Sequence, residues 1–366
     1  MGEELFYKIA LTKIPQVGPR LARTLIAYTG SPEAVFSESP AKLIKIPGIG
    51  PKIVKSLRSI QTTKSIEKDI LYLERHQIKS MFYLDDDFPG RLRHFEDAPV
   101  MLYFKGSPNW NFHRTVGVVG TRKPTIHGKN NCKKLIRGLR ELDVQIVSGL
   151  AYGIDTVVHQ EANNHQIENL AIMGSSIDYI YPASNRSLAN AIAQNGALCS
   201  EFSLGTKPDR ENFPLRNRII AMLSDAIVVV ESPEKGGSLI TSEYANIYNK
   251  DVFAFPGRVQ DPKATGCNRL IKSHKAALIE GVDDIRYVMR WDKQNESKTH
   301  QMKLFEQLSS NEKKLLDVFP VEYDIAIDDL HARSNVTMSE LASLLLNLEF
   351  KGLICSLPGK RYILHR

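Results

Sequence analysis

The sequence predicts an α/β protein built on a doubly wound parallel sheet, with a helical N-terminal domain and a C-terminal winged helix. Three observations support this fold class. Short β-branched runs alternate with helical patterns from Thr115 to about Val288, as they do in parallel α/β sheets. A pattern of glycine and proline repeats within the first 65 residues. Three helical patterns and a hairpin close the chain.

Length and composition are those of a globular protein with several domains. The chain has 366 residues, of which 42% are hydrophobic and 24% are charged, the usual range for folded domains. No stretch is apolar and long enough to span a bilayer, and the N-terminus is acidic before it is basic, unlike a signal peptide. We therefore expect a cytoplasmic protein with no membrane partner. We place its domains at 1–65, 66–290 and 300–366.

The formal charge of +7 is concentrated near the N-terminus. Residues 1–65 carry ten Lys and Arg against four Asp and Glu, whereas residues 301–366 carry eight against nine. A basic excess is typical of surfaces that bind polyanions, although it also favours solubility. The four cysteines are far apart and form no C-x-x-C pair, so we expect buried thiols rather than a disulfide framework or a zinc site.

The N-terminal domain contains an internal repeat. Residues 14–26, IPQVGPRLARTLI, and 46–58, IPGIGPKIVKSLR, share a pattern in which Gly18 and Gly50 are offset by 32 residues. Each copy resembles a helix-hairpin-helix motif, as in SAM-like domains, whose Gly-apolar-Gly turn brings backbone amides close to a nucleic-acid phosphate. The first copy has Gln16 where the motif has its first glycine. The alternative is a helical domain whose repeats only pack on each other.

The stretch Thr115–Arg122, TVGVVGTR, predicts the first strand of the parallel sheet and the turn that follows it. Such sheets bind ligands outside the carboxyl ends of their strands, where the amides of the next helix favour an anion. Thr121 adds a hydroxyl donor and Arg122 a planar fork for phosphate oxygens. The alternative is an ordinary turn whose Arg122 is a solvated surface charge.

The same turn disfavours a dinucleotide. It offers only Gly117 and Gly120 in place of G-x-G-x-x-G, and the second strand ends at Ser148-Gly149 without an acidic residue. NAD is therefore disfavoured, and we expect no cofactor.

The rest of this region alternates as a Rossmann-like domain should. We expect helices at Ile126–Leu142 and Ser187–Gln194 and another through Ile220, and strands at Val144–Ser148, Leu170–Gly174, Ala197–Ser200, Ala226–Glu231 and Val252–Phe255. A helical pattern at Ser65–His76 leads to two earlier β-like runs, Ile78–Leu84 and Val100–Phe104, that could extend the sheet.

Asp155 and His159 are four residues apart on a predicted helix and could together bind a metal. No third ligand is evident nearby in the sequence, so we expect a hydrogen-bonded structural pair instead, and no metal.

The segment Thr206–Ile220, TKPDRENFPLRNRII, interleaves cations with an aromatic residue. Its cations are Lys207, Arg210, Arg216 and Arg218, and they flank Phe213. Cations for phosphates beside an aromatic face for a base are typical of single-strand grooves. Arg216 and Arg218 would lie on different faces of a helix, so they cannot bind one phosphate together, and one could instead anchor the loop. The alternative is a basic surface loop with Phe213 buried.

Seven ordered motifs across 115–280 resemble the family of DNA-processing protein A (DprA, also called Smf). They are VGVVGTR, SGLAYGID, IMGSSIDYIYP, SEFSLGTKP, FPLRNRII, GGSLITSEYA, and VFAFPGRV followed by GCNRLI. The sequence departs from the family pattern at Thr121, Tyr152 and Ser176, where serine, arginine and glycine are usual. The change at 152 removes a cation from its turn.

This resemblance implies a protein that is not an enzyme. It implies that the Rossmann-like domain binds single-stranded DNA in a positively charged pocket, and that the protein protects incoming single strands, forms a homodimer and loads a RecA-type recombinase during natural transformation. Matched residue by residue, the pocket would comprise Arg122, Arg210, Phe213, Arg216 and Asn217, beside the turn Gly236-Gly237-Ser238, with Lys250 as a further candidate.

After a polar linker from Trp291 to Thr299, the pattern predicts a winged helix. Helices are expected at Ser310–Val318, Ile327–Arg333 and Ser339–Glu349, before a hairpin, Leu353–Leu364, turned at Pro358-Gly359. The third helix has no Lys or Arg, whereas a helix that reads the major groove needs cations and base-edge donors. We therefore expect this module to contact protein or to regulate.

The main competing function is enzymatic. The stretch GGSLITSE places Glu243 at the spacing of the P-G-G-x-G-T-x-x-E signature of nucleotide phosphoribohydrolases of the lysine-decarboxylase-like type. Leu239 and Ile240 replace the motif's Gly-Thr, so the backbone could approach a nucleotide phosphate less closely. We therefore favour single-strand binding. A scaffold with no salt-sensitive DNA affinity is the second alternative.

Overall fold

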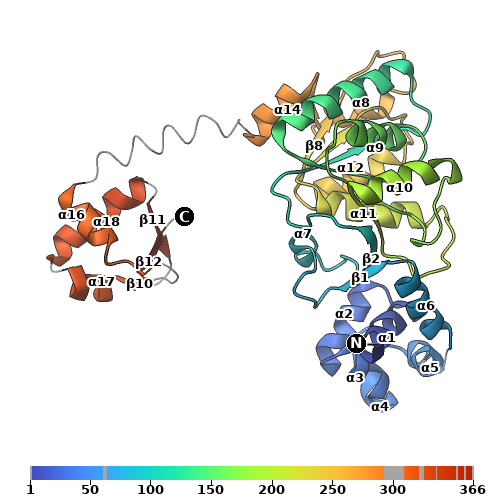
Figure 1. Cartoon of the computed structure of the whole chain (residues 1–366), viewed down its shortest axis with the longest axis horizontal. Coiled ribbons are helices and arrows are strands. Elements are labelled where there is room, and N and C mark those ends of the chain that lie inside the picture. Colours follow the sequence, from blue (N-terminus) through green and yellow to red (C-terminus); the bar gives the residue numbers. More distant parts are fainter. Residues whose placement is uncertain are drawn as a thin grey trace. The chain divides into compact units, whose positions relative to one another are not determined.

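The computed structural model describes residues 2–60, 64–291, 309–320, 325–334, 336–351, 353–357 and 360–364. The chain forms two compact units, Met1–Trp291 and Asp292–Arg366 (Figure 1). The predicted linker after Trp291 and the turn at Pro358-Gly359 lie outside the described residues. Within the described ranges, no helix is long and apolar enough to cross a membrane.

The larger unit is organised around a nine-stranded sheet of order β1-β2-β6-β5-β4-β3-β7-β8-β9. Strands β3 to β9 pair in parallel, whereas β1 and β2 form an antiparallel extension on β6. The doubly wound sheet and its extension by the runs near residues 78 and 100 are thus confirmed. The strands are β1 Lys79–Phe82, β2 Met101–Gly106, β3 Thr115–Val119, β4 Gln145–Ser148, β5 Asn169–Ile172, β6 Gly196–Ser200, β7 Ala226–Val229, β8 Asp251–Ala254 and β9 Ala277–Leu278.

The strand order reverses between β3 and β7. The chain runs outward from β3 through β4 and β5 to β6, and then returns to β7 on the other side of β3. Val119 is in register with Val229, so the turns that follow β3 and β7 begin at the same edge of the sheet. Open α/β sheets bind ligands at such a switch point.

Helices cover both faces of the sheet (Figure 1). Helices α8 (Ile126–Leu139), α9 (Ile154–Asn164) and α14 (Val282–Met289) share one buried apolar cluster with β3, β4 and β7. The opposite cluster contains side chains of α7 (Gly90–Arg93), α11 (Asn212–Leu223), α12 (Ser238–Ile247) and α13 (Thr265–Lys272). The predicted helix Ile126–Leu142 ends as a 3₁₀ turn, η1 (Arg140–Leu142). A second 3₁₀ turn, η2 (Ala183–Asn185), leads into α10 (Arg186–Gln194).

In the described ranges 2–60 and 64–78, six helices precede the sheet and contain the predicted repeat. They are α1 Gly2–Thr12, α2 Pro19–Thr29, α3 Pro32–Ser37, α4 Pro40–Leu43, α5 Pro51–Ile60 and α6 Lys64–Arg75. Helices α2 and α5 begin at the prolines that follow Gly18 and Gly50. Gly48, in the second copy, has a φ of 82°, and its counterpart Gln16 has a φ of 66°. The first copy therefore keeps the left-handed turn that glycine adopts most easily.

The N-terminal helices share a core with the sheet. Leu25 and Phe36 belong to the same buried cluster as Tyr103 of β2 and Ile192 of α10. This continuity explains why the helical region and the sheet form one compact unit.

The smaller unit is the predicted winged helix. Its helices are α16 Ser310–Leu316, α17 Ile327–Ser334 and α18 Met338–Phe350, and its sheet has the order β10-β12-β11. Strands β11 (Ile354–Leu357) and β12 (Arg361–Leu364) form the predicted hairpin, and β10 (Ile325–Ala326) is an additional short strand.

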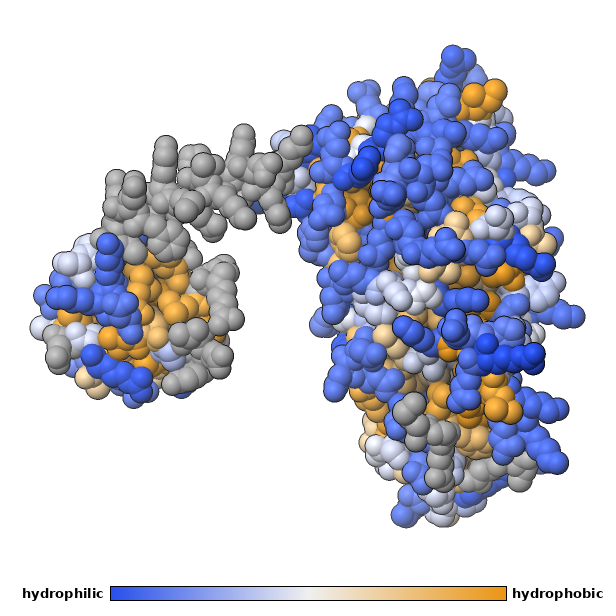
Figure 2. Space-filling model, viewed as in Figure 1, coloured by the Kyte–Doolittle hydropathy of each residue, from blue (hydrophilic) through white to orange (hydrophobic). Residues whose placement is uncertain are grey.

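The surface of this unit exposes apolar side chains and one cysteine. Met338, Leu346 and Phe350 of α18 are exposed, and apolar side chains gather on the visible face of the unit in Figure 2. Cys355 is also exposed, contrary to the prediction of buried thiols, because the alternation of β11 turns Ile354 inward. The other three cysteines are buried as expected.

Candidate functional site

A cavity of about 320 Å³ lies at the switch point of the sheet. It is formed by the turn after β3, the first half of α11 and the start of α12. Nine of the twelve residues singled out in the sequence line it, namely Thr121, Arg122, Arg210, Phe213, Arg216, Asn217, Gly236, Gly237 and Ser238. We call this hollow the switch-point cavity.

The turn after β3 is held rigidly by its neighbours. The Thr121 N–H donates to the Glu231 carbonyl at 2.7 Å, and the Ile154 N–H donates to the Thr121 carbonyl at 3.1 Å. Gly153 has a φ of 82°, and a Cβ atom there would collide with the backbone of Thr121 and Arg122. A glycine is therefore required for the turn before α9 to pack against the turn that carries Arg122.

The start of α8 does not present a free anion site, contrary to the sequence-based expectation for this turn. The Thr125 N–H donates to the Glu231 carboxylate at 3.0 Å, and the Thr125 hydroxyl donates to the same group. The Glu231 carboxylate also lies against Gly128 in the first turn. A buried side chain thus supplies the negative charge that a helix N-terminus favours, and an external phosphate would have to bind elsewhere.

Phe213 and Arg122 form the centre of the switch-point cavity. The Arg122 guanidinium lies over the Phe213 ring at 4.6 Å from its centroid. The ring is half-buried and packs on Gly174, where a Cβ atom would lie 2.8 Å from Phe213 Cδ1. Arg122 itself is exposed. The cavity therefore offers an accessible aromatic edge beside a cation.

Arg216 is an internal anchor rather than a surface cation. Its side chain is only 4% exposed, and it donates to the Ile172 carbonyl and, through Nε, to Asn217 Oδ1 at 3.1 Å. Both its guanidinium and the Asp155 carboxylate crowd Gly149, where a Cβ atom would collide with them. Burial lowers the pKa of Arg216 and raises that of Asp155, and the attraction between the two charges opposes both shifts.

The start of α12 contributes small polar groups. Asn217 Nδ2 donates to the Gly237 carbonyl at 3.2 Å, which ties α11 to the glycine turn. Helix α12 has no side-chain cap at Gly237. The Thr241 hydroxyl is buried, lines the cavity and has no hydrogen-bond partner among the described residues. This wall can therefore donate hydrogen bonds to an anion in the cavity.

Three predicted residues lie away from this cavity. Lys207 is an exposed loop residue. Arg218 is buried and pairs with the Glu201 carboxylate. Lys250 is half-buried, lies 6.0 Å from the Phe95 ring centroid, and has a pKa lowered by burial. Both Arg216 and Arg218 thus serve as internal anchors of α11.

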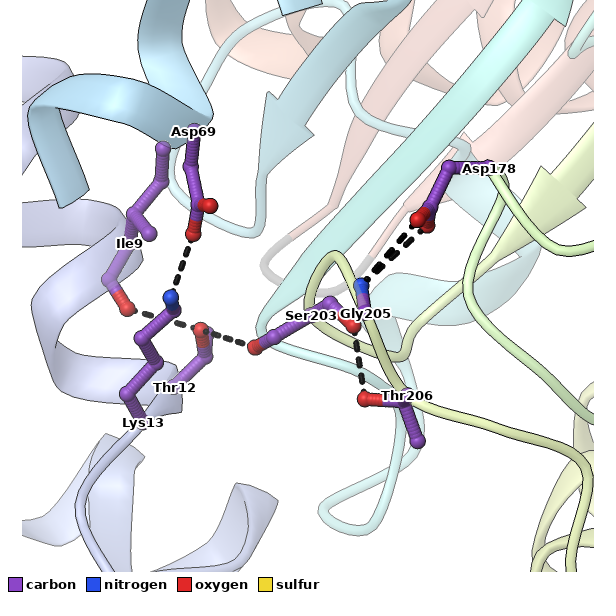
Figure 3. Close-up of polar contacts among 8 residues, drawn as sticks. All are labelled: Ile9, Thr12, Lys13, Asp69, Asp178, Ser203, Gly205 and Thr206. Atoms are coloured by element: carbon purple, nitrogen blue, oxygen red, sulfur yellow. Dashed lines mark hydrogen bonds and ion pairs between the residues drawn. The ribbon is translucent and has the colours of Figure 1, made fainter. Parts of the chain in front are cut away.

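The loop before α11 is fixed to the N-terminal helices (Figure 3). The Thr12 and Ser203 hydroxyls are 3.3 Å apart, and the Gly205 N–H donates to the Asp178 carboxylate at 3.3 Å. Ser176, which replaces a usual glycine, donates through its hydroxyl to the Thr206 carbonyl at 3.0 Å. This substitution adds a contact to the loop that leads to Arg210 and Phe213.

Sequence reasoning missed the role of Asp155 in this cavity. Asp155 and His159 are not the hydrogen-bonded pair that was expected, because each has its own partner. Asp155 accepts from the Ala151 N–H at 3.3 Å, whereas His159 Nδ1 lies 2.7 Å from Asn169 Oδ1. Among the described residues, no group of three His, Cys, Asp or Glu could hold a metal ion. The sequence did contain a signal for this role, because Asp155 follows the glycine turn after β4, and turns after parallel strands line the binding edge of the sheet.

Glu243 lies in a neighbouring groove of about 420 Å³ on the other side of the turn Gly236-Gly237. It is exposed there, and Lys235 and Arg269 line the same groove. Of the described residues that line the switch-point cavity, Asp155 is the only acid.

Three family models match consecutive parts of the chain. Residues 8–59 match the SAM-like helix-hairpin-helix tandem, residues 79–290 match DNA recombination-mediator protein A, and residues 306–360 match the DprA winged helix domain. The first match confirms the tandem repeat, including the copy with Gln16.

Relatives of known name are similar over most of their length. Protein Smf of Synechocystis sp. is 32% identical over 403 residues, which cover 99% of both chains. The DNA processing protein DprA of Streptococcus pneumoniae is 38% identical over 210 residues, which cover 57% of this chain and 74% of the relative.

Two solved structures share the fold. The X-ray structure of DprA from Streptococcus pneumoniae has a TM-score of 0.66 and 32% identity, and covers 76% of this chain and 96% of that one. DprA from Helicobacter pylori has a TM-score of 0.53 and 28% identity, and covers 58% and 95%. The latter structure is described as giving insight into a single-stranded DNA binding mode.

Proposed function

From the premise that the chain belongs to the DNA recombination-mediator protein A family, we propose that it binds single-stranded DNA at the switch-point cavity. The role in DNA processing follows from membership of this family. The proposal concerns the ligand, its site and its use.

The observation that carries the proposal is the pairing of the Phe213 ring with Arg122 in an open cavity. A base can stack only if its flat face is free, as it is in a single strand and not inside a duplex. Arg122 lies over the ring and the exposed Arg210 lines the same cavity, so both supply cations for the flanking phosphates. The cavity therefore favours a single strand over a duplex.

The start of α12, which lines the same cavity as Arg122, suits a phosphate. The turn Gly236-Gly237 leads into α12, which begins at Ser238. The Thr241 hydroxyl, without a hydrogen-bond partner in the described part of the chain, lines the same cavity. Because Glu231 already occupies the start of α8, this second helix start is the place for an external anion.

We propose no catalytic role for this site. Asp155 is the buried counter-ion of Arg216, whose positive charge favours the ionised carboxylate. Glu243 lies in the neighbouring groove. Release of free base from a nucleoside monophosphate by the purified protein would instead support the phosphoribohydrolase alternative.

We further propose that the protein is a homodimer in the cytoplasm that protects incoming single strands and loads a RecA-type recombinase during natural transformation. The family description as a recombination mediator supports this role. The exposed apolar residues of α18 support a protein-contact role for the winged helix. The same helix contains no Lys or Arg that could contact DNA phosphates.

The site is tested by binding isotherms of the full chain with matched single- and double-stranded oligonucleotides over a series of salt concentrations. We expect tighter binding of the single strand and an affinity that falls as salt rises. Equal affinity for both forms, or no salt dependence, would contradict the proposed site.

The recombinase role requires a separate experiment. Recombinase filaments would be followed on single strands coated with a single-strand-binding protein, with and without this protein, and nuclease digestion would report protection. We expect faster filament formation and slower digestion. Sedimentation of the free protein would determine whether it is a dimer, and a strictly monomeric protein would contradict that part of the proposal.

A further inference from the structure

A second hollow of about 700 Å³ adjoins the switch-point cavity and shares Arg122 with it. Its walls come from the loop that leads into α8, the first turns of α9, and η2. We call it the Tyr152 hollow. Its charged lining residues are Arg122, Lys123 and Lys129, so among the described residues that line it there is no acid.

The two lysines are free to meet a polyanion. Lys123 and Lys129 are exposed, and in the described ranges neither side chain forms a salt bridge. Lys133, one turn further along α8, pairs with Glu161 at 3.2 Å instead. Unpaired cations at a concave surface attract a phosphate backbone more strongly than cations already neutralised by a carboxylate.

Tyr152 gives the hollow an aromatic surface. Its side chain is 47% exposed, so its ring is accessible from the hollow. Its ring lies 6.2 Å from that of Tyr181, whose ring in turn lies 5.9 Å from that of Phe213. A series of three aromatic rings therefore connects the hollow with the switch-point cavity.

The fold fixes Tyr152 beside Arg122. Gly153 allows the two turns to touch, and the bond from the Ile154 N–H to the Thr121 carbonyl locks them together. The tyrosine replaces the arginine that is usual at this position in the resembling family, so a stacking surface stands where a cation would be expected.

We propose that the Tyr152 hollow is a second single-strand subsite, in which Tyr152 stacks on a base while Lys123 and Lys129 contact the phosphates that flank it. This inference rests on the proposed function, because it extends the bound strand from the switch-point cavity past Arg122. It makes the strand's path longer than the cavity alone and gives this chain a stacking residue of its own.

The test measures affinity of the full chain for oligothymidylates of increasing length. For the wild type, affinity should rise with length until both hollows are filled. Tyr152→Ala should reduce affinity for long oligomers by about 5- to 100-fold while leaving the shortest ones unaffected, because stacking a base is lost only in the second hollow. Tyr152→Trp should retain long-oligomer affinity. Tyr28→Ala, an exposed tyrosine on α2, is the matched control.

Salt dependence separates the phosphate contacts from stacking. Lys123→Ala and Lys129→Ala should each reduce the slope of log affinity against log salt by about 0.7, whereas Lys134→Ala, an exposed lysine on the same helix, should leave it unchanged. Tyr152→Arg should steepen the slope by a similar amount, because it adds a cation.

The outcomes distinguish this inference from the proposed function. If the wild type does not bind single strands, the proposed function fails. If Phe213→Ala weakens binding at every length but Tyr152→Ala has the same length dependence as the wild type, only the second subsite is wrong. A Tyr152→Ala variant that binds DNA normally but loses a protein partner would overturn the inference and assign the hollow to protein contact.

Discussion

The Arg122 guanidinium lies 4.6 Å from the centroid of the Phe213 ring, and that of Arg216 lies 5.9 Å from the same centroid. The two arginines come from different elements and differ in exposure, since Arg122 is exposed and Arg216 is buried. The Phe213 ring therefore packs on its buried side against Gly174 and is covered on its other side by the exposed Arg122 side chain. This arrangement separates a binding role from a structural role within one cavity.

Phe213→Ala should reduce single-strand affinity by about 1–3 kcal/mol, and Phe213→Trp should retain most of it, because stacking tolerates any flat aromatic face. Binding isotherms and thermal melts of both variants would be measured together. If Phe213 serves only the core, both variants melt at a lower temperature, and affinity per folded molecule does not change.

Arg122→Ala should weaken single-strand binding and flatten its salt dependence without lowering the melting temperature, because Arg122 is exposed and is a proposed phosphate contact. Titrations at several salt concentrations provide the measurement. An unchanged salt slope would remove Arg122 from the proposed contact set.

Arg218→Ala should lower the stability of the fold rather than the affinity for single strands. It leaves the buried Glu201 carboxylate without its partner, which typically destabilises a fold by about 3–5 kcal/mol. Denaturant unfolding would show this loss, while the salt slope of the remaining folded protein stays that of the wild type. A normal melting temperature with a flattened slope would return Arg218 to the DNA contacts.

Stability should fall on acidification because of His159. Burial lowers the pKa of His159 to about 4 from an ordinary value of 6.5. Above pH 6.5 the ring is neutral in both folded and unfolded chains, so nothing is lost. Between the two values only the unfolded chain takes up a proton, which disfavours folding by up to about 3 kcal/mol near pH 4.

The measurement is denaturant unfolding of the wild type and His159→Gln across this pH range. Both tryptophans, Trp110 and Trp291, belong to the larger unit, so their fluorescence reports its unfolding. The difference in unfolding free energy between the two proteins should shrink as the pH falls. A constant difference would show that His159 does not titrate between the two states.

Deletion of residues 300–366 should leave single-strand affinity nearly intact. The segment carries no basic excess, and α18 contains neither Lys nor Arg. Anisotropy with a long oligothymidylate would compare the shortened and full chains. A loss as large as that of Phe213→Ala would assign a DNA contact to the winged helix.

The sequence by itself was sufficient for the order of the elements, and the predicted site residues include nine of the eighteen that line the switch-point cavity. The period of apolar residues reveals helices and strands locally, and glycines at strand ends mark the turns where parallel sheets bind ligands. These local patterns singled out Thr121 and Arg122 at the end of the first strand, whereas the resemblance to the DNA-processing protein A family was needed to place Phe213 and the turn at Gly236 in the same pocket. The repeat at Gly18 and Gly50 was visible for the same local reason.

The destination of each charge was decided only by the tertiary structure. Arg210, Arg216 and Arg218 are close in the sequence, yet one is exposed and two are buried beside acidic residues from elsewhere in the chain, Asp155 of α9 and Glu201 directly after β6. Glu231, far from α8 in the chain, fills the anion site that the sequence predicted at the turn after β3. Pairing of charges and closure of a helix start depend on residues brought together across the sheet, and no local pattern records them.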